Sequence, residues 1–217
     1  MAGDTSTDMP ARRFETLVAD VAACQACERM AHAHVLGDAS GPIDALVVFI
    51  AEAVGRRGGA VSGVPLTRDE SGKRFQDFLA LAGMRRTDCF ITNAVLCNPI
   101  DDRGRNRTPS VREIARCRPF LARTLDVVRA PTVVTLGRVA LEALRAVAPH
   151  EGSLPDERPR GVPWRSRTLI PMYHPSRRST LHRAHERQEQ DWRDLGDLIR
   201  AQRSLTALCP EWALLLP

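Results

Sequence analysis

Four short runs of apolar residues along the chain predict buried strands. They lie at 45–51 (ALVVFIA), 89–96 (CFITNAVL), 132–136 (TVVTL) and 168–173 (TLIPMY). Between these runs, apolar residues recur every three or four positions, which is the period of an amphipathic helix. The expected helices cover 14–23, 72–82, 110–128, 137–147 and 186–202. Strands that alternate with helices predict a three-layer α/β/α fold around a mostly parallel, four-stranded central sheet.

Length and composition suit one such domain. The chain has 217 residues, of which 43% are hydrophobic and 26% charged, enough for one sizeable core. We expect a single domain over 1–217, with its core at about 14–203 and peripheral segments at 1–13 and 204–217. The apolar runs are far too short to span a membrane, and the first thirteen residues lack the pattern of a secretory signal. We therefore expect a soluble, cytoplasmic protein that acts as a monomer and does not contact membranes.

The charge of the chain favours an anionic partner. Its formal net charge is +5 and its pI is near 9.2, a lean toward polyanions such as nucleic acid. Lysine supplies just one of the 31 basic residues, Lys73, and all the others are arginine. Chemistry that requires a lysine Schiff base therefore has almost no place in this chain.

Six cysteines in a chain expected to be cytosolic favour a metal or cluster site over disulfides. Four of them form an uneven set: Cys24, Cys27, Cys97 and Cys117. The first two make a C-x-x-C pair, the third ends a predicted strand, and the fourth lies on the helix that follows. Such a set suits a [4Fe–4S] cluster, a zinc ion or simply buried thiols. The other two, Cys89 and Cys209, are expected to be structural.

Polar side chains stand where three of the predicted strands end: Glu52, Asn93 and His174. Each of them, taken singly, also suits an ordinary structural role. Because ligands bind at the carboxyl ends of parallel strands, the three side chains are expected to converge in one crevice although they are far apart in sequence.

With these motifs in order, the chain resembles the iron–sulfur (family 4 type) uracil-DNA glycosylases over roughly residues 20–200. The resemblance rests on C-x-x-C at 24–27, AEAVG at 51–55, GVPL at 63–66, TNAVLC at 92–97, CRPFL at 117–121, LGR at 136–138 and YHPS at 173–176. It implies a uracil-DNA glycosylase-like fold and a structural [4Fe–4S] cluster held by the four cysteines. DNA containing uracil or a modified base is the partner that it implies.

The resemblance also implies a role for each site residue. His174 would donate a hydrogen bond to the pyrimidine O2, Asn93 would read the edge of the base, and Glu52 would hold the attacking water or stabilise the cationic sugar. Asp69 and Glu70 are alternatives for that last role. The base pocket would be lined by Ala53, Val54, Gly55 and Leu66. DNA would be contacted by Ser176, Arg177, Arg178, Leu181 and Arg183, with Arg178 or Leu181 as the wedge that replaces the flipped base.

Departures from the family pattern leave the target base open. Ala51 and Val54 replace the glycine and proline of the GEAPG motif, and Leu66 replaces the aromatic residue that stacks on uracil. We expect a monofunctional glycosylase that removes uracil and leaves an abasic site. One alternative is a glycosylase for a bulkier modified pyrimidine, such as a hypermodified cytosine of phage DNA, acting in antiphage defence. Another is a catalytically silent binder of damaged DNA.

Overall fold

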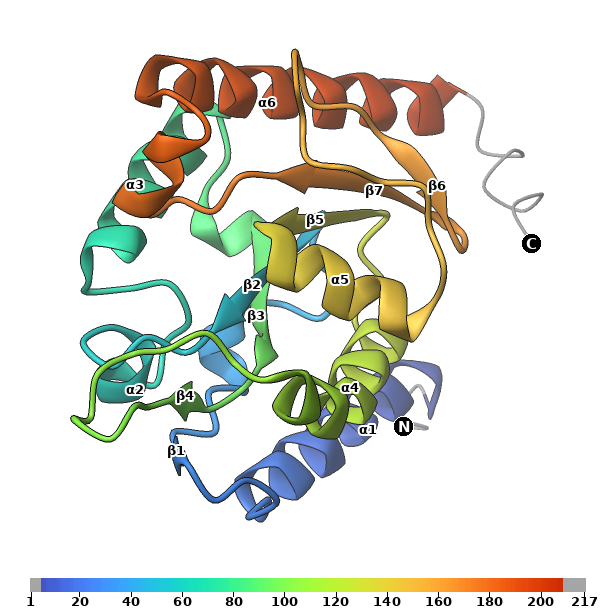
Figure 1. The fold of residues 1–217 in the computed structure, drawn as a ribbon. Coiled ribbons are helices and arrows are strands. Elements are labelled where there is room, and N and C mark those ends of the chain that lie inside the picture. The colour runs from blue at the N-terminus through green and yellow to red at the C-terminus, as the bar shows by residue number, and fades with distance from the viewer. Residues whose placement is uncertain (1–4, 209–217) are drawn as a thin grey trace.

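A five-stranded sheet forms the centre of the molecule (Figure 1). The computed structural model describes residues 5–208, with the side chains of residues 9–204. The strand order is β3 (Cys89–Val95), β2 (Val47–Ala53), β5 (Thr132–Leu136), β7 (Arg167–Met172) and β6 (Val162–Trp164). The first four strands are parallel, and β6 runs antiparallel to β7. The mostly parallel sheet is thus confirmed, with one more strand than the four expected.

The fifth strand escaped the sequence analysis because it carries almost no pattern. It is three residues long, contains Pro163 and buries only Trp164. Proline cannot donate to a sheet and is tolerated at edges, which is where β6 lies.

Helices cover both faces of the sheet, so the expected three layers are present (Figure 1). One face packs against α1 (Thr5–Ala22), α4 (Val111–Val127) and α5 (Arg138–Val147), and the other against α3 (Glu70–Leu81) and α6 (His185–Leu208). The alternation of side chains along β2 explains both cores, because Val48 and Ile50 belong to the first core, and Val47 and Phe49 to the second.

The two terminal helices are longer than the sequence predicted. Helix α1 begins at Thr5 and α6 ends at Leu208, so helical structure enters both segments that were expected to be peripheral. The start of α1 gave no signal because Phe14 is the first of its described side chains to be buried. Cys209 and the rest of the tail lie outside the described residues. Among the helices between residues 5 and 208, none is both long and apolar enough to cross a membrane.

The loops that carry the candidate site residues lie at the carboxyl edge of the sheet. Ala51 on β2 pairs with Asn93 on β3, and His174 lies two positions beyond the end of β7. Beside them, β1 (Met30–Ala31) pairs with β4 (Asn98–Pro99) in a separate two-stranded sheet, and α2 (Gly59–Ser62) follows β2. The polar strand ends therefore face the same region.

Candidate active site and cysteine centre

A cleft of about 870 Å³ opens at the carboxyl edge of the sheet. It is lined by Glu52, Asn93 and His174, so the structure brings together the three side chains that the sequence placed at strand ends. The four residues expected to form a base pocket, Ala53, Val54, Gly55 and Leu66, also line it. Polar groups of the sheet edge and apolar residues at and after the end of β2 therefore line the same cleft.

Among the described residues, Glu52 is one of the two carboxylates, with Asp69, that line this cleft. It is half-buried near the end of β2, and burial raises its pKa. The positive charge of Arg178 and a hydrogen bond from the Thr108 side chain both act in the opposite direction and lower that pKa. Two groups therefore favour the charged form of Glu52, and the loss of water around it, which is the larger effect, disfavours that form.

Asn93 brings a hydrogen-bond donor that the described residues leave unused. The residue is 3% exposed, and its Nδ2 hydrogen-bonds to none of them. Because buried amides in folded proteins nearly always have partners, an unused donor beside a cleft indicates a group that is satisfied by a ligand.

His174 is held as a neutral imidazole. Burial lowers its pKa to about 4, so it carries no charge at neutral pH. Gly137, at the start of α5, has φ +89° and lies so close that an added Cβ would be 3.2 Å from the Cβ of His174. Glycine at this position tolerates the backbone conformation and leaves room for the histidine.

Leu66, on the loop between α2 and α3, enters the cleft in a strained backbone conformation with φ +49°. Arg86 holds this conformation by donating from Nη1 to the Leu66 carbonyl at 3.4 Å and from Nη2 to the Pro65 carbonyl at 2.5 Å. The sequence analysis missed Arg86, since no motif links it to a loop twenty positions away.

The segment after His174 carries most of the residues expected to contact DNA. Ser176, Arg178 and Leu181 line the cleft, and Leu181 is 80% exposed, one of four large apolar side chains exposed among the described residues. Arg177 is exposed outside the cleft, where its Nε lies 3.2 Å from Oε1 of Glu70. The short 3₁₀ helix Arg177–Leu181 thus contributes one cation, Arg178, and one apolar side chain, Leu181, to the cleft, with Arg177 exposed outside it.

Arg183 does not face the cleft as expected. It is 8% exposed and pairs with Asp191, with Nε to Oδ2 at 2.9 Å and Nη2 to Oδ1 at 2.5 Å. Its remaining bonds go to the carbonyls of Asp156 and Glu157. We therefore remove Arg183 from the DNA-contacting set, because its donors are committed to the fold.

A second, smaller hollow of about 460 Å³ adjoins the cleft. Its lining includes three exposed arginines, Arg56, Arg57 and Arg68. Asp69 lines both hollows, and its Oδ1 caps α3 by accepting from the Gly72 N–H at 2.9 Å. The alternative acid Asp69 therefore already has a structural task, while Glu70, the other alternative, belongs to the second hollow and pairs with Arg177.

The four cysteines expected to bind a cluster gather at the other side of the loops. Three of them, Cys27, Cys97 and Cys117, pack in one cluster with Met30 and Val95. Burial raises the pKa of Cys97 and raises that of Cys117 to about 11, and the neighbouring cysteines, Cys24 included, add to both increases. Four thiols from three segments, gathered in this way, form a donor set that fits a metal centre.

Two histidines adjoin the cysteine group, which the sequence analysis did not foresee. Ligand atoms of His32, His34 and Cys97 lie within 4.8 Å of one another, a group that could hold a metal ion. His34 also shares a hydrogen bond of 2.8 Å between its Nε2 and the Cys24 carbonyl. Cys89 lies apart at the start of β3, where burial raises its pKa to about 12, in line with a structural role.

The fold and the cleft define the class of protein. An α/β/α domain with a carboxylate, an amide and a neutral histidine at the carboxyl edge of its sheet, beside exposed arginines and a cysteine centre, has the construction of a DNA glycosylase. The chain belongs to the uracil DNA glycosylase superfamily, whose sequence model matches residues 39–196.

Individual relatives agree with this assignment. The chain is 27% identical over 195 residues to the type-4 uracil-DNA glycosylase of Archaeoglobus fulgidus, covering 85% of this chain and 92% of that protein. It is 29% identical to the type-4 enzyme of Thermotoga maritima, covering 70% and 76% of the two chains, and 34% identical to that of Saccharolobus solfataricus, covering 56% and 55%. The resemblance drawn from the motifs is thereby confirmed, and the protein is a member of an enzyme family.

Proposed function

We propose that the protein is a monofunctional DNA glycosylase that flips a uracil nucleotide out of DNA and hydrolyses its N-glycosidic bond. The observation that carries this proposal is the grouping of an unpartnered Asn93 amide, a neutral His174 and a desolvated Glu52 in one cleft. The names of the relatives, all uracil-DNA glycosylases, support uracil as the base. We propose that the enzyme acts as a monomer in the cytoplasm, since the described residues of one chain supply every group of the proposed site.

His174 and Asn93 would act on the base. When the N-glycosidic bond breaks, the pyrimidine leaves as an anion whose charge develops on O2, and a preorganised donor there stabilises the transition state. A neutral imidazole can supply such a donor, and the low pKa of His174 keeps it neutral. Asn93 would read the N3 and O4 edge through its amide, which has both a donor and an acceptor.

Glu52 would act on the sugar. Loss of the base leaves a cationic, oxocarbenium-like sugar that needs a negative charge nearby and a water molecule to attack it. The Glu52 carboxylate can supply the charge and orient the water. Arg178 and Thr108 favour its ionised form despite burial, which is the form that this role requires.

Ser176, Arg177, Arg178 and Leu181 would hold the DNA. Arginine–phosphate contacts would fix the backbone on both sides of the flipped nucleotide. Leu181, exposed and lining the cleft, would fill the space that the base leaves in the DNA helix, and its apolar side chain supports Leu181 over Arg178 as the wedge. Arg178 would remain near Glu52.

The cysteine centre would hold a [4Fe–4S] cluster through Cys24, Cys27, Cys97 and Cys117. When bound, the cluster would join the amino-terminal loop to β3 and α4 and would have a structural role. About four iron and four sulfide per chain, with broad visible absorbance, are expected from anaerobically purified protein. Stoichiometric zinc in a colourless sample would contradict this assignment. Cys97→Ser should lose the iron, whereas the separate Cys89→Ser should retain it.

A bulkier modified pyrimidine is the second candidate substrate. A cleft of about 870 Å³ is in the range of sites for ligands much larger than one pyrimidine, and Leu66 offers no flat ring for uracil to stack on. The adjoining arginine-lined hollow adds space beside the pocket. Excision of a hypermodified cytosine from phage DNA would make the enzyme a defence factor.

One assay distinguishes these functions. The purified protein is incubated with oligonucleotides that carry uracil, thymine, hydroxymethylcytosine or its glucosylated form, and alkali then reveals abasic sites. Cleavage at uracil supports the first proposal, and cleavage at the glucosylated base alone supports the second. Bound DNA without abasic sites in any oligonucleotide would indicate a silent binder. His174→Ala and Asn93→Ala should each reduce the rate by roughly 10²–10³-fold.

The same assay tests whether the enzyme is monofunctional. Without alkali the strand should stay intact, because strand nicking needs an amine nucleophile and Lys73 is exposed on the first turn of α3, outside the residues that line the cleft. An adduct trapped by borohydride in the wild type and absent in Lys73→Ala would contradict this mechanism.

A further inference from the structure

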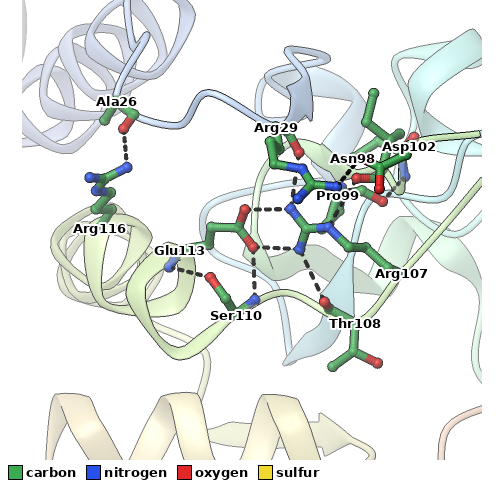
Figure 2. Close-up of polar contacts among 11 residues, drawn as sticks. Ala26, Arg29, Asn98, Pro99, Asp102, Arg107, Thr108, Ser110, Glu113 and Arg116 are labelled. Atoms are coloured by element: carbon green, nitrogen blue, oxygen red, sulfur yellow. Dashed lines mark hydrogen bonds and ion pairs between the residues drawn. The ribbon is translucent and has the colours of Figure 1, made fainter. Parts of the chain in front are cut away.

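One arginine, Arg107, stands where the cysteine-bearing segments meet (Figure 2). Its guanidinium has five N–H groups, and all of them are used. Nε donates to the Ile100 carbonyl at 3.0 Å. Nη1 donates to the Thr108 carbonyl at 3.2 Å and to Oε2 of Glu113 at 2.7 Å, and Nη2 to the Arg29 carbonyl at 3.1 Å and to Oε1 of Glu113 at 2.6 Å. This side chain has no donor left for a DNA phosphate.

The acceptors belong to each segment that supplies a cysteine. Arg29 ends the loop that carries Cys24 and Cys27, and Ile100 follows the strand end that carries Cys97. Glu113 lies in the first turn of α4, four positions before Cys117. A single guanidinium therefore connects three segments that are far apart in sequence and whose cysteines Cys27, Cys97 and Cys117 pack in one cluster.

Glu113 makes this connection rigid. Its side chain is 10% exposed and binds Arg107 through both oxygens, a bidentate pairing with defined geometry. Oε2 also accepts from the Ser110 N–H at 2.7 Å in the capping box of α4. A second arginine, Arg116, donates to the Ala26 carbonyl inside the C-x-x-C loop, from the same helix (Figure 2).

We call Arg107, Glu113 and the carbonyls that Arg107 binds the cysteine frame. The cysteine frame reaches the cleft through the residue after Arg107, Thr108. Arg107 holds the carbonyl of Thr108. Thr108, Arg107 and Glu52 all line the cleft, and the Thr108 side chain is one of the groups that lower the pKa of Glu52. Thr108 is thus held by Arg107 through its backbone while its side chain faces the cleft that contains the proposed catalytic carboxylate.

We propose that Arg107 is a positioning residue that couples the cysteine centre to Glu52. It holds the three cysteine-bearing segments in place for the metal centre, and the same frame fixes Thr108 so that its hydroxyl holds the Glu52 carboxylate. The catalytic role of Glu52 in this coupling rests on the proposed function. The coupling would explain why the cysteine centre, which lies outside the cleft, affects the reaction.

Three variants separate the two halves of this coupling. Arg107→Lys keeps the positive charge but loses the planar guanidinium that reaches all five acceptor atoms. Thr108→Val removes only the hydroxyl and leaves the carbonyl that Arg107 binds. Arg29→Lys is the matched control, since Arg107 binds the backbone carbonyl of Arg29, whereas the Arg29 side chain is 60% exposed and pairs with Asp102, which is 91% exposed.

The readouts are iron retention and the protonation of Glu52, and neither requires a substrate. Iron loss to a chelator is followed by visible absorbance. The Glu52 carboxyl band is followed by infrared titration of protein labelled with ¹³C-glutamate and is assigned by its absence in Glu52→Gln. Arg178, which also lowers the pKa of Glu52, is unchanged in every variant.

Arg107→Lys should lose iron about 10- to 100-fold faster than the wild type, the cost typical of an outer-shell partner, and should raise the midpoint of the Glu52 titration. Thr108→Val should raise the same midpoint, because its hydroxyl favours the ionised form, and should retain iron. Arg29→Lys should change neither. If Arg107→Lys does not fold, Glu113→Gln, which weakens the same pairing without changing side-chain shape, should give both effects on a smaller scale.

Two results would overturn the proposal. If Arg107→Lys loses iron but the midpoint of the Glu52 titration is unchanged, the cysteine frame does not reach the cleft. If Arg107→Lys retains iron as well as Arg29→Lys does, Arg107 does not hold the cysteine centre. Wild-type protein that excises no base would overturn the proposed function, while these two readouts would still decide the coupling.

Discussion

The neutral state of His174 can be tested directly, because burial should keep it unprotonated at pH values where an ordinary histidine is charged. A pKa of about 4 replaces the usual 6.5. At pH 6, about 1% of His174 should then be protonated, against about three quarters of a histidine with an unshifted pKa. The difference of about 2.5 units corresponds to about 3 kcal/mol in favour of the neutral ring.

Stability should depend on pH in a direction that this shift fixes. Between pH 6.5 and 4 the unfolded chain binds a proton at residue 174 and the folded chain does not, so the free energy of unfolding falls as the pH falls through this window. His174 contributes a loss of at most about 3 kcal/mol by pH 4. Urea unfolding of the wild type and of His174→Asn should therefore diverge between pH 7 and pH 4, with the smaller decline in the variant.

Nitrogen NMR of histidine-labelled protein supplies the direct measurement. The His174 signals, assigned by their absence in His174→Asn, should keep the chemical shifts of a neutral ring down to pH 5. The single-turnover rate of base release should show no inflection from this residue between pH 5 and 8. A His174 titration with a midpoint near 6.5 would refute the reasoning, since the donor to O2 would then be a charged imidazolium at low pH.

Three further perturbations test the electrostatics of the chain. Replacing Arg177 and Arg178 with glutamine should weaken DNA binding across all sequences and reduce the slope of log K against log salt by about 2, measured by fluorescence anisotropy; an unchanged slope would place phosphate contacts elsewhere. Asp191→Asn should cost about 3–5 kcal/mol in urea unfolding, because it leaves Arg183 buried without its charged partner. The pKa of Glu113 is lowered to about 2, so Glu113→Gln should destabilise the protein at pH 7, and its difference from the wild type should shrink as the pH falls from 4.5 toward 2.

Much of the fold could be predicted because the chain signals it locally. The four parallel strands are continuous apolar runs, and the helices between them carry clear apolar stripes. Where the signal was missing, the prediction failed. Strand β6 is too short to show alternation, and the first turns of α1 precede the first buried side chain of that helix.

The convergence of Glu52, Asn93 and His174 was also predictable, for a geometric reason. Parallel strands end at one edge of a sheet, so polar residues at their ends meet without any local contact in sequence. Leu66 was placed in the pocket by the resemblance to a family and not by this geometric argument. The positive φ and the contacts from Arg86 that hold it there leave no mark in the sequence.

The arginines show most clearly why composition is a weak guide to partners. The net charge of +5 suggested a polyanion, yet Arg183 is buried and committed to Asp191 and backbone carbonyls, and Arg107 to Glu113 and to three backbone carbonyls. A lysine could not replace either, since an ammonium lacks the planar fork that reaches several fixed acceptors at once. The exposed arginines beside the cleft, such as Arg178 and Arg68, are those with donors to offer DNA. The bias toward arginine in this chain therefore serves the framework as well as the DNA surface, and only the structure separates the two groups.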